Sequence, residues 1–120
     1  MRRDKADAGY LWDMLDAAKA VVEFTAGKTL EDYLKDRLLR HAVERVVEII
    51  GEAARKVSNE LRGQHPEIPW TKIIAQRHVV VHEYDDLQDS LIWVVATTHA
   101  TDLIRLLEPL VPTPPPLPED

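Results

Sequence analysis

The chain has 120 residues, a formal net charge of −6 and no cysteine. This length allows one domain with a single core, and the absence of thiols excludes disulfides, cysteine nucleophiles and thiolate metal sites. The negative charge argues against broad, sequence-independent binding to nucleic acid. Because there is neither a signal-type apolar run nor a run that could span a bilayer, we expect a cytoplasmic protein that does not associate with membranes.

The first predicted helix spans Asp4 to about Phe24. Its apolar residues recur at spacings of three and four: Tyr10, Leu11, Met14, Leu15, Ala18, Val21, Val22 and Phe24. Gly27 is placed to end this helix, since glycine adopts the left-handed conformation of a C′ residue at little cost. Thr29 and Asp32 have the spacing of a capping box, which predicts that a second helix begins at Leu30.

The second predicted helix is long and runs from Leu30 to about Leu61. Its predicted apolar stripe consists of Leu34, Leu38, Ala42, Val46, Ile49, Ile50, Ala53, Val57 and Leu61. Gly51 lies inside this helix, where glycine costs about 1 kcal/mol relative to alanine. We therefore expect a close approach of another helix or a slight bend at this position.

Two further helices complete the predicted domain. Residues 63–69 form a short loop, and Pro69 is suited to the first turn of a third helix, which continues to Tyr84. Asp85 or Asp86 caps the last helix, from Leu87 to Glu108, whose apolar positions are Leu87, Leu91, Val94, Val95, Thr98, Leu103, Ile104, Leu106 and Leu107. Residues 111–120 are rich in proline and predict a disordered tail. The predicted fold is an all-α, antiparallel four-helix bundle over residues 1–110.

The third helix carries an arginine where an apolar residue is expected. On an ideal helical wheel, Trp70, Ile73, Ile74, Val80, Val81 and Tyr84 lie within about 60° of Arg77. A guanidinium at the centre of a buried stripe is costly to desolvate unless it is paired or faces a cleft. Arg77 therefore marks the most promising candidate site in the chain.

One interpretation of this site is RNA cleavage. His78 or His82 has the pKa range needed to take the 2′-hydroxyl proton or to protonate the leaving 5′-oxygen. Arg77 can hold the scissile phosphate with two donors, and Tyr84 can help to position it. No metal is needed, because the 2′-hydroxyl of RNA is an internal nucleophile.

Two other interpretations remain open from the residues alone. His78 and His82 are four residues apart, as in zinc-binding helices, although a third ligand would have to come from Glu83, Asp85 or His99. Alternatively, Arg77 pairs with a buried glutamate of the second helix and the histidines only pack.

Ideal helix geometry constrains the catalytic interpretation. His82 lies about 140° from Arg77 and about 160° from Tyr84, so one helix cannot direct all three side chains at one phosphate. Either the helix ends near His82, so that His82 and Tyr84 project alike from an extended segment, or a symmetric partner contributes a second copy of these residues.

At these residues the chain resembles HEPN-superfamily proteins of the HepT type. The family motif is an arginine, four residues, a histidine, one residue and a tyrosine, which matches Arg77, His82 and Tyr84. The resemblance extends over about residues 4–110 through blocks in family order: Tyr10-Leu11-Trp12-Asp13-Met14, Phe24-Thr25-Ala26-Gly27, Ala42-Val43-Glu44-Arg45, Glu48-Ile49-Ile50-Gly51-Glu52-Ala53 and His65-Pro66-Glu67-Ile68-Pro69-Trp70.

The resemblance implies an all-helical, metal-independent ribonuclease toxin without a cofactor, in which both copies of a homodimer line one RNA-cleaving cleft. It also implies a nucleotidyltransferase antitoxin of the MntA type that transfers AMP from ATP onto the motif tyrosine, here Tyr84. Two positions depart from the pattern: His78 stands where relatives often have asparagine, and Glu83 where many have glycine. Because a carboxylate beside His82 can raise its pKa or repel phosphate, a non-catalytic module that binds a nucleotide or a nucleotidyltransferase is the alternative.

Overall fold

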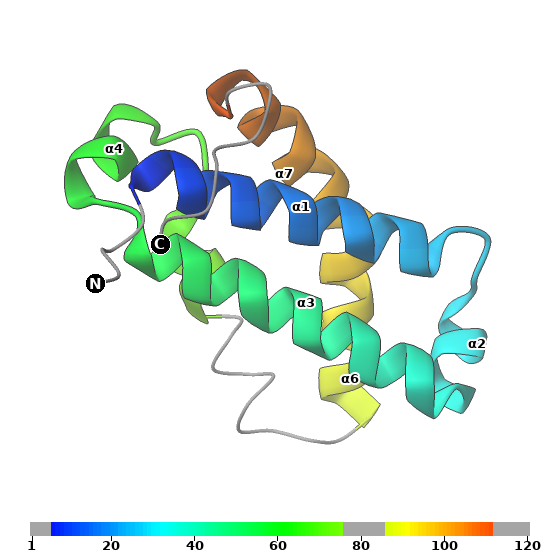
Figure 1. The fold of residues 1–120 in the computed structure, drawn as a ribbon. Coiled ribbons are helices and arrows are strands. Elements are labelled where there is room, and N and C mark those ends of the chain that lie inside the picture. The colour runs from blue at the N-terminus through cyan, green and yellow to red at the C-terminus, as the bar shows by residue number, and fades with distance from the viewer. Residues whose placement is uncertain (1–5, 76–85, 112–120) are drawn as a thin grey trace, which may run out of the picture.

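The computed structural model describes residues 6–75 and 86–111, and these residues form an all-α bundle (Figure 1). The prediction of an all-α fold is confirmed. The elements in chain order are α1 (Asp7–Thr25), α2 (Leu30–Lys35), α3 (Arg37–Lys56), α4 (Asn59–Gln64), a helical segment over residues 70–75, α6 (Asp86–Val94), the π-helical turn η1 (Val95–His99), α7 (Ala100–Leu107) and the 3-10 helix η2 (Glu108–Leu110).

The end of α1 and the start of α2 follow the local sequence signals. Gly27 has a φ of +72°, the left-handed conformation expected after a helix. The capping box is present, since the Asp32 N–H donates to Thr29 Oγ1 at 3.1 Å and the Thr29 N–H donates to the Asp32 carboxylate at 2.9 Å. These hydrogen bonds lower the pKa of Asp32. Both predictions, the glycine stop and the Thr29 cap, are confirmed.

The prediction of one uninterrupted second helix is wrong at Asp36. This residue has an extended backbone (φ −104°, ψ 99°) and caps α3, because its side chain accepts a hydrogen bond from the Leu39 N–H at 3.0 Å. The break frees the Leu34 carbonyl, which accepts a hydrogen bond from the Arg40 guanidinium instead. Asp has a strong preference for the N-cap position, and here that preference divides the predicted helix into α2 and α3.

A second interruption separates α3 from α4. Val57 is extended, and Ser58 caps α4 by accepting from the Leu61 N–H at 3.2 Å. The Ser58 N–H and hydroxyl also donate to the Asp7 carboxylate at 2.9 and 2.6 Å. Ser58 and Asp7 are 51 residues apart in sequence, so helix periodicity alone could not predict this contact.

The predicted stripe is confirmed at Ile50, Ala53 and Val57, which are buried, but the buried face at the start of α3 differs from the prediction. Leu38 is 80% exposed, whereas Leu39 is buried. The buried residues of α3 are Leu39, Val43, Val47, Ile50, Gly51, Ala53 and Ala54. Because Asp36 starts a new helix, the phase of α2 does not carry over into α3. Gly51 is buried and α3 continues through it.

The last predicted helix is present, but its buried face also differs from the prediction. Leu91 and Val94 are 49% and 45% exposed, and Ile92, Ala96 and Ala100 are buried instead, whereas the predicted Leu103 and Leu107 are buried as expected. The turn η1 widens the helix between α6 and α7, and a wider turn needs more residues to return to the same face. The core face therefore passes through Ile92, Ala96 and Ala100 at intervals of four.

The packing of α1 against α3 and α7 organises the bundle. In Figure 1, α1 and α3 run side by side in opposite directions, and the helix formed by α6, η1 and α7 crosses behind them. One core cluster joins α1, α3, α7 and residues 68–73, and a second joins α1, α2, α3 and α6. Leu110 and Val111 still pack against the first cluster, and residues 112–120 of the predicted tail lie outside the described residues.

Candidate functional site

The predicted site residues Arg77, His78, His82 and Tyr84 lie outside the described residues. Glu83 and Asp85, which the sequence analysis considered as metal ligands or caps, lie outside them too. The structure describes the two elements that border this segment, the helical residues 70–75 and α6.

The helical segment before Arg77 is firmly anchored. Trp70 and Ile73 are buried in the core, as the predicted stripe requires, and Ile74 is half-buried. The Trp70 indole N–H donates to the His65 carbonyl at 3.0 Å, and the Ile73 N–H donates to the Pro69 carbonyl at 3.0 Å. Burying a large apolar side chain contributes about 1.5–3 kcal/mol. The segment that precedes the predicted motif is therefore a helix packed into the core, and it ends at Ala75, two residues before Arg77.

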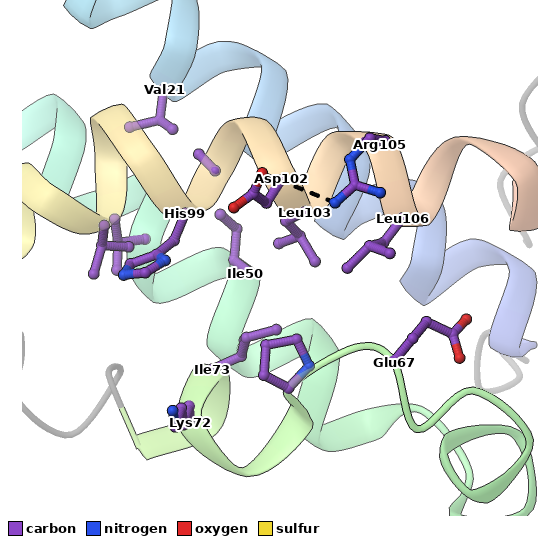
Figure 2. A pocket seen from close by; sticks show the side chains of 14 residues that line it. Val21, Ile50, Glu67, Lys72, Ile73, His99, Asp102, Leu103, Arg105 and Leu106 are labelled. Carbon is purple, nitrogen blue, oxygen red and sulfur yellow. Dashed lines mark ion pairs between the residues drawn. The ribbon is translucent and has the colours of Figure 1, made fainter.

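A groove of about 330 Å³ lies between this segment and α7 (Figure 2). Its apolar walls consist of Val21, Val47, Ile50, Pro69, Ile73, Val95, Ala100, Leu103 and Leu106, and its polar residues are Glu67, Lys72, His99, Asp102 and Arg105. The groove could not be predicted from the sequence, because Lys72 and His99 are 27 positions apart and share no local pattern. His99 had a predicted role only as a possible metal ligand, and Lys72 had none.

The polar residues of the groove are not evenly distributed. In Figure 2, Lys72 and His99 lie toward one end and Glu67 lies toward the other. The Glu67 carboxylate is 3.2 Å from the His65 ring, and the Asp102 carboxylate is 3.9 Å from the Arg105 guanidinium. The two acidic residues thus have cationic or ionisable neighbours, whereas Lys72 and His99 form no ion pair with another described residue.

The glutamates of α3 are the candidate partners in the interpretation that pairs Arg77 with a buried glutamate. Glu48 and Glu52 lie 2.6 and 3.6 Å from the Arg45 guanidinium. Glu44 lies 3.4 Å from the His41 ring, and its pKa is raised by partial burial and by the charge of Asp89. Each half-buried glutamate of α3 therefore has another basic neighbour, and the pairing of Arg77 remains a prediction.

Beside Glu44, the core contains a buried phenol. The Tyr33 hydroxyl has no hydrogen-bond partner among residues 6–75 and 86–111, and its pKa is raised mainly by burial and further by the charges of Glu44 and Asp89. Its ring packs against Trp93 at a centroid distance of 5.2 Å. Tyr33 is thus held neutral, as part of the contact between α2 and α6.

The metal-site interpretation depends on His78 and His82, which lie outside the described residues, so it stays a prediction. Within residues 6–75 and 86–111, no group of three histidine, aspartate or glutamate side chains is arranged to hold an ion. In the same ranges, no helix combines the length and apolarity needed to cross a membrane.

Comparisons with known proteins place the chain in a family. Residues 14–110 match the profile of the family described as "Ribonuclease HepT-like". The chain is 37% identical over 93 residues to "Probable ribonuclease HepT" of Thermococcus cleftensis, an alignment that covers 78% of this chain and 83% of the relative. It is 34% identical over 86 residues to "Putative RNase MJ1380" of Methanocaldococcus jannaschii, covering 72% and 79%.

A relative from Caldanaerobacter subterraneus, "Putative RNase TTE0752", is 35% identical over 89 residues, covering 74% of this chain and 80% of its own. No solved structure matches the chain. The family match includes most of the described bundle and the whole segment from Arg77 to Tyr84, and the chain therefore belongs to the HepT-like ribonuclease family.

Proposed function

We propose that the chain is the ribonuclease toxin of a toxin–antitoxin pair, acting on RNA in the cytoplasm. The observation that carries this proposal is the family match over residues 14–110, which includes the complete motif of Arg77, His82 and Tyr84. The relatives named as ribonucleases support the same reaction class.

The proposed reaction is an internal transesterification that requires no metal. A base removes the proton from the 2′-hydroxyl, the 2′-oxygen attacks the adjacent phosphorus, and the bond from phosphorus to the 5′-oxygen breaks. The products are a 2′,3′-cyclic phosphate and a 5′-hydroxyl, which receives its proton from an acid. His82 serves as the acid–base group, Arg77 stabilises the charge on the phosphate, and His78 and Tyr84 assist in positioning it.

A homodimer completes the proposed site. One helix cannot direct Arg77, His82 and Tyr84 at one phosphate, whereas two copies can contribute complementary residues to a shared cleft. The exposed Leu91 and Val94 on α6 support this assembly, because they form an apolar face on the element that follows the motif. A second copy covering that face would bring the two motif segments close together.

The proposed partner in the cell is a nucleotidyltransferase antitoxin that attaches AMP to Tyr84. The adenylyl group adds negative charge and bulk next to the phosphate site, and both effects exclude RNA. After coexpression with the antitoxin, mass spectrometry should show an addition of about 329 Da on Tyr84.

The decisive experiment compares the wild type with Arg77→Ala and His82→Ala in an RNA cleavage assay that contains excess chelator. We expect each variant to lose at least about 100-fold in cleavage rate, the usual scale of a lost acid–base or charge-stabilising group. Light scattering should show that both variants remain dimers. Lys28→Ala, in the exposed turn between α1 and α2, is the matched control and should cleave normally. The proposal fails if the wild type cleaves no RNA and both motif variants stay as toxic to cells as the wild type.

Glu83 favours one second candidate, a module that binds a nucleotide or a nucleotidyltransferase without cleaving RNA. Its carboxylate adjoins His82 in sequence and can repel phosphate. This candidate predicts a stable complex with the nucleotidyltransferase while RNA stays intact with the unmodified protein. Restoration of cleavage by Glu83→Gly in an inactive wild type would identify Glu83 as the cause.

A further inference from the structure

The groove between α7 and residues 66–73 lies directly upstream of the predicted motif. Lys72 and Ile73 contribute to it from the helical segment that ends at Ala75, and His99 contributes from the turn η1 on the opposite wall. Arg77 is five residues after Lys72 in the chain. The groove therefore adjoins the predicted motif along the chain.

The walls of the groove fit an uncharged, flat group. Ile50, Ile73 and Leu103 are buried apolar residues that contribute to its interior. The volume of about 330 Å³ lies at the small end of the range for pockets that hold small molecules, about 300–1,000 Å³. This is suitable for one nucleoside and small for a folded peptide element.

The polar residues of the groove indicate at which end the phosphate of a ligand would lie. Lys72 and His99 lie at one end without ion-pair partners among the described residues, whereas Glu67 lies at the other end and Arg105 is paired with Asp102 at 3.9 Å. A lysine ammonium is a point charge suited to phosphate, and the His99 ring can donate a hydrogen bond to a phosphate oxygen. His99 ends the π-helical turn, a type of distortion that is frequent at functional sites.

We propose that this groove holds one nucleoside of the RNA strand beside the scissile phosphate. The base lies against the apolar walls near Leu103, and the phosphate next to it lies between Lys72 and His99. This inference rests on the proposed function and extends it, because it assigns a substrate-binding subsite to residues outside the motif. An extended protein segment in the groove is the competing occupant, but an apolar segment would give no partner to the Lys72 ammonium, which has none among the described residues.

The first test measures binding of a fluorescent single-stranded RNA to the full-length His82→Ala protein, by anisotropy in excess chelator. Adding Lys72→Glu should weaken binding at least about tenfold, and His99→Ala about threefold, because each removes a phosphate contact. Lys72→Ala should also lower the slope of log affinity against log salt by about 0.7, the value for one contact to a single strand. Lys28→Glu makes the same charge change in the α1–α2 turn and should have less than about a twofold effect.

The second test separates base binding from phosphate binding. Leu106 is half-buried on the groove wall, and Leu106→Trp should fill the space that the base would occupy. We expect this variant to bind intact RNA about tenfold more weakly than the His82→Ala parent does. An RNA that lacks the base at the bound position should bind the variant and the parent equally. Circular dichroism and light scattering establish that the variant keeps its helices and its dimer.

The outcomes distinguish this inference from the proposed function. If wild-type protein cleaves RNA and Lys72→Glu and Leu106→Trp bind and cleave it normally, the subsite is overturned and the ribonuclease remains. If these two variants retain RNA cleavage but lose binding to the nucleotidyltransferase, the groove binds protein and the inference is wrong. If the wild type neither binds nor cleaves RNA, the proposed function fails together with the subsite.

Discussion

The two sides of the bundle differ in how completely they are closed. Between α1 and α3, the side chains of Met14, Ala18, Val43 and Ala54 have no exposed surface. On the side of α6 and α7, Leu91 and Val94 are exposed, and a groove remains open beside Lys72 and His99. Complete burial is thus concentrated between α1 and α3, whereas the side of α6 and α7 keeps exposed apolar side chains and an open groove, on which the proposed dimer and RNA contacts depend.

Met14→Ala should have the largest effect on stability. Met14 is fully buried in α1, and a Met→Ala substitution in a core costs about 2–5 kcal/mol. Urea denaturation at pH 7 should show this loss. At a temperature where the variant is still folded, its RNA cleavage should be near normal, since the closed side does not contact substrate. A loss below about 1 kcal/mol would mean that the α1–α3 contact does not dominate stability.

Ser58→Ala should have a smaller effect, about 1–2 kcal/mol, because it removes both the α4 cap and the hydroxyl contact with Asp7. A double-mutant cycle with Asp7→Ala separates the two contributions. The cycle should give a coupling energy of about 0.5–1 kcal/mol between these residues. Additive effects would show that Ser58 acts only as a cap.

Glu44→Gln should stabilise the protein slightly near pH 7. Burial and the neighbouring Asp89 raise the pKa of Glu44, so the native state binds more protons than the unfolded state between the two pKa values. Stability is therefore lost as the pH rises from the unfolded pKa through the folded one. Urea midpoints should be higher for the variant at pH 7 and equal to those of the wild type below about pH 4. The opposite pH dependence would show that His41 outweighs burial.

Leu91→Lys should leave the stability of the subunit within about 0.5 kcal/mol, since Leu91 is half exposed. The same change should weaken the homodimer, because a lysine ammonium would have to be desolvated between two apolar faces. Sedimentation velocity over a concentration series measures the fractions of monomer and dimer. An unchanged dimer would place the interface elsewhere. Lys35→Ala, on the exposed face of α2, is the control and should change neither subunit stability nor dimerisation.

The sequence predicted the elements that depend on local interactions. Gly27 ends α1 and the Thr29–Asp32 capping box begins α2, because each uses only hydrogen bonds or backbone conformations within a few residues. The buried Trp70 and Ile73 follow from periodicity in the same way. The motif from Arg77 to Tyr84 was also visible in the sequence, and the family to which that motif pointed is confirmed.

The break at Asp36 uses a local N-cap, whereas only the tertiary structure decided the break at Ser58 and the register of the buried face in the first turns of α3 and in α6. Ser58 leaves the helix to bind Asp7, 51 residues away, and η1 shifts the buried face of the last helix from Leu91 to Ile92. The groove that brings Lys72 near His99 likewise exists only after α7 has packed beside residues 66–73. Local sequence sets caps and helix propensity, whereas the competition between a continuous helix and a distant contact depends on the free energy of the whole packed chain.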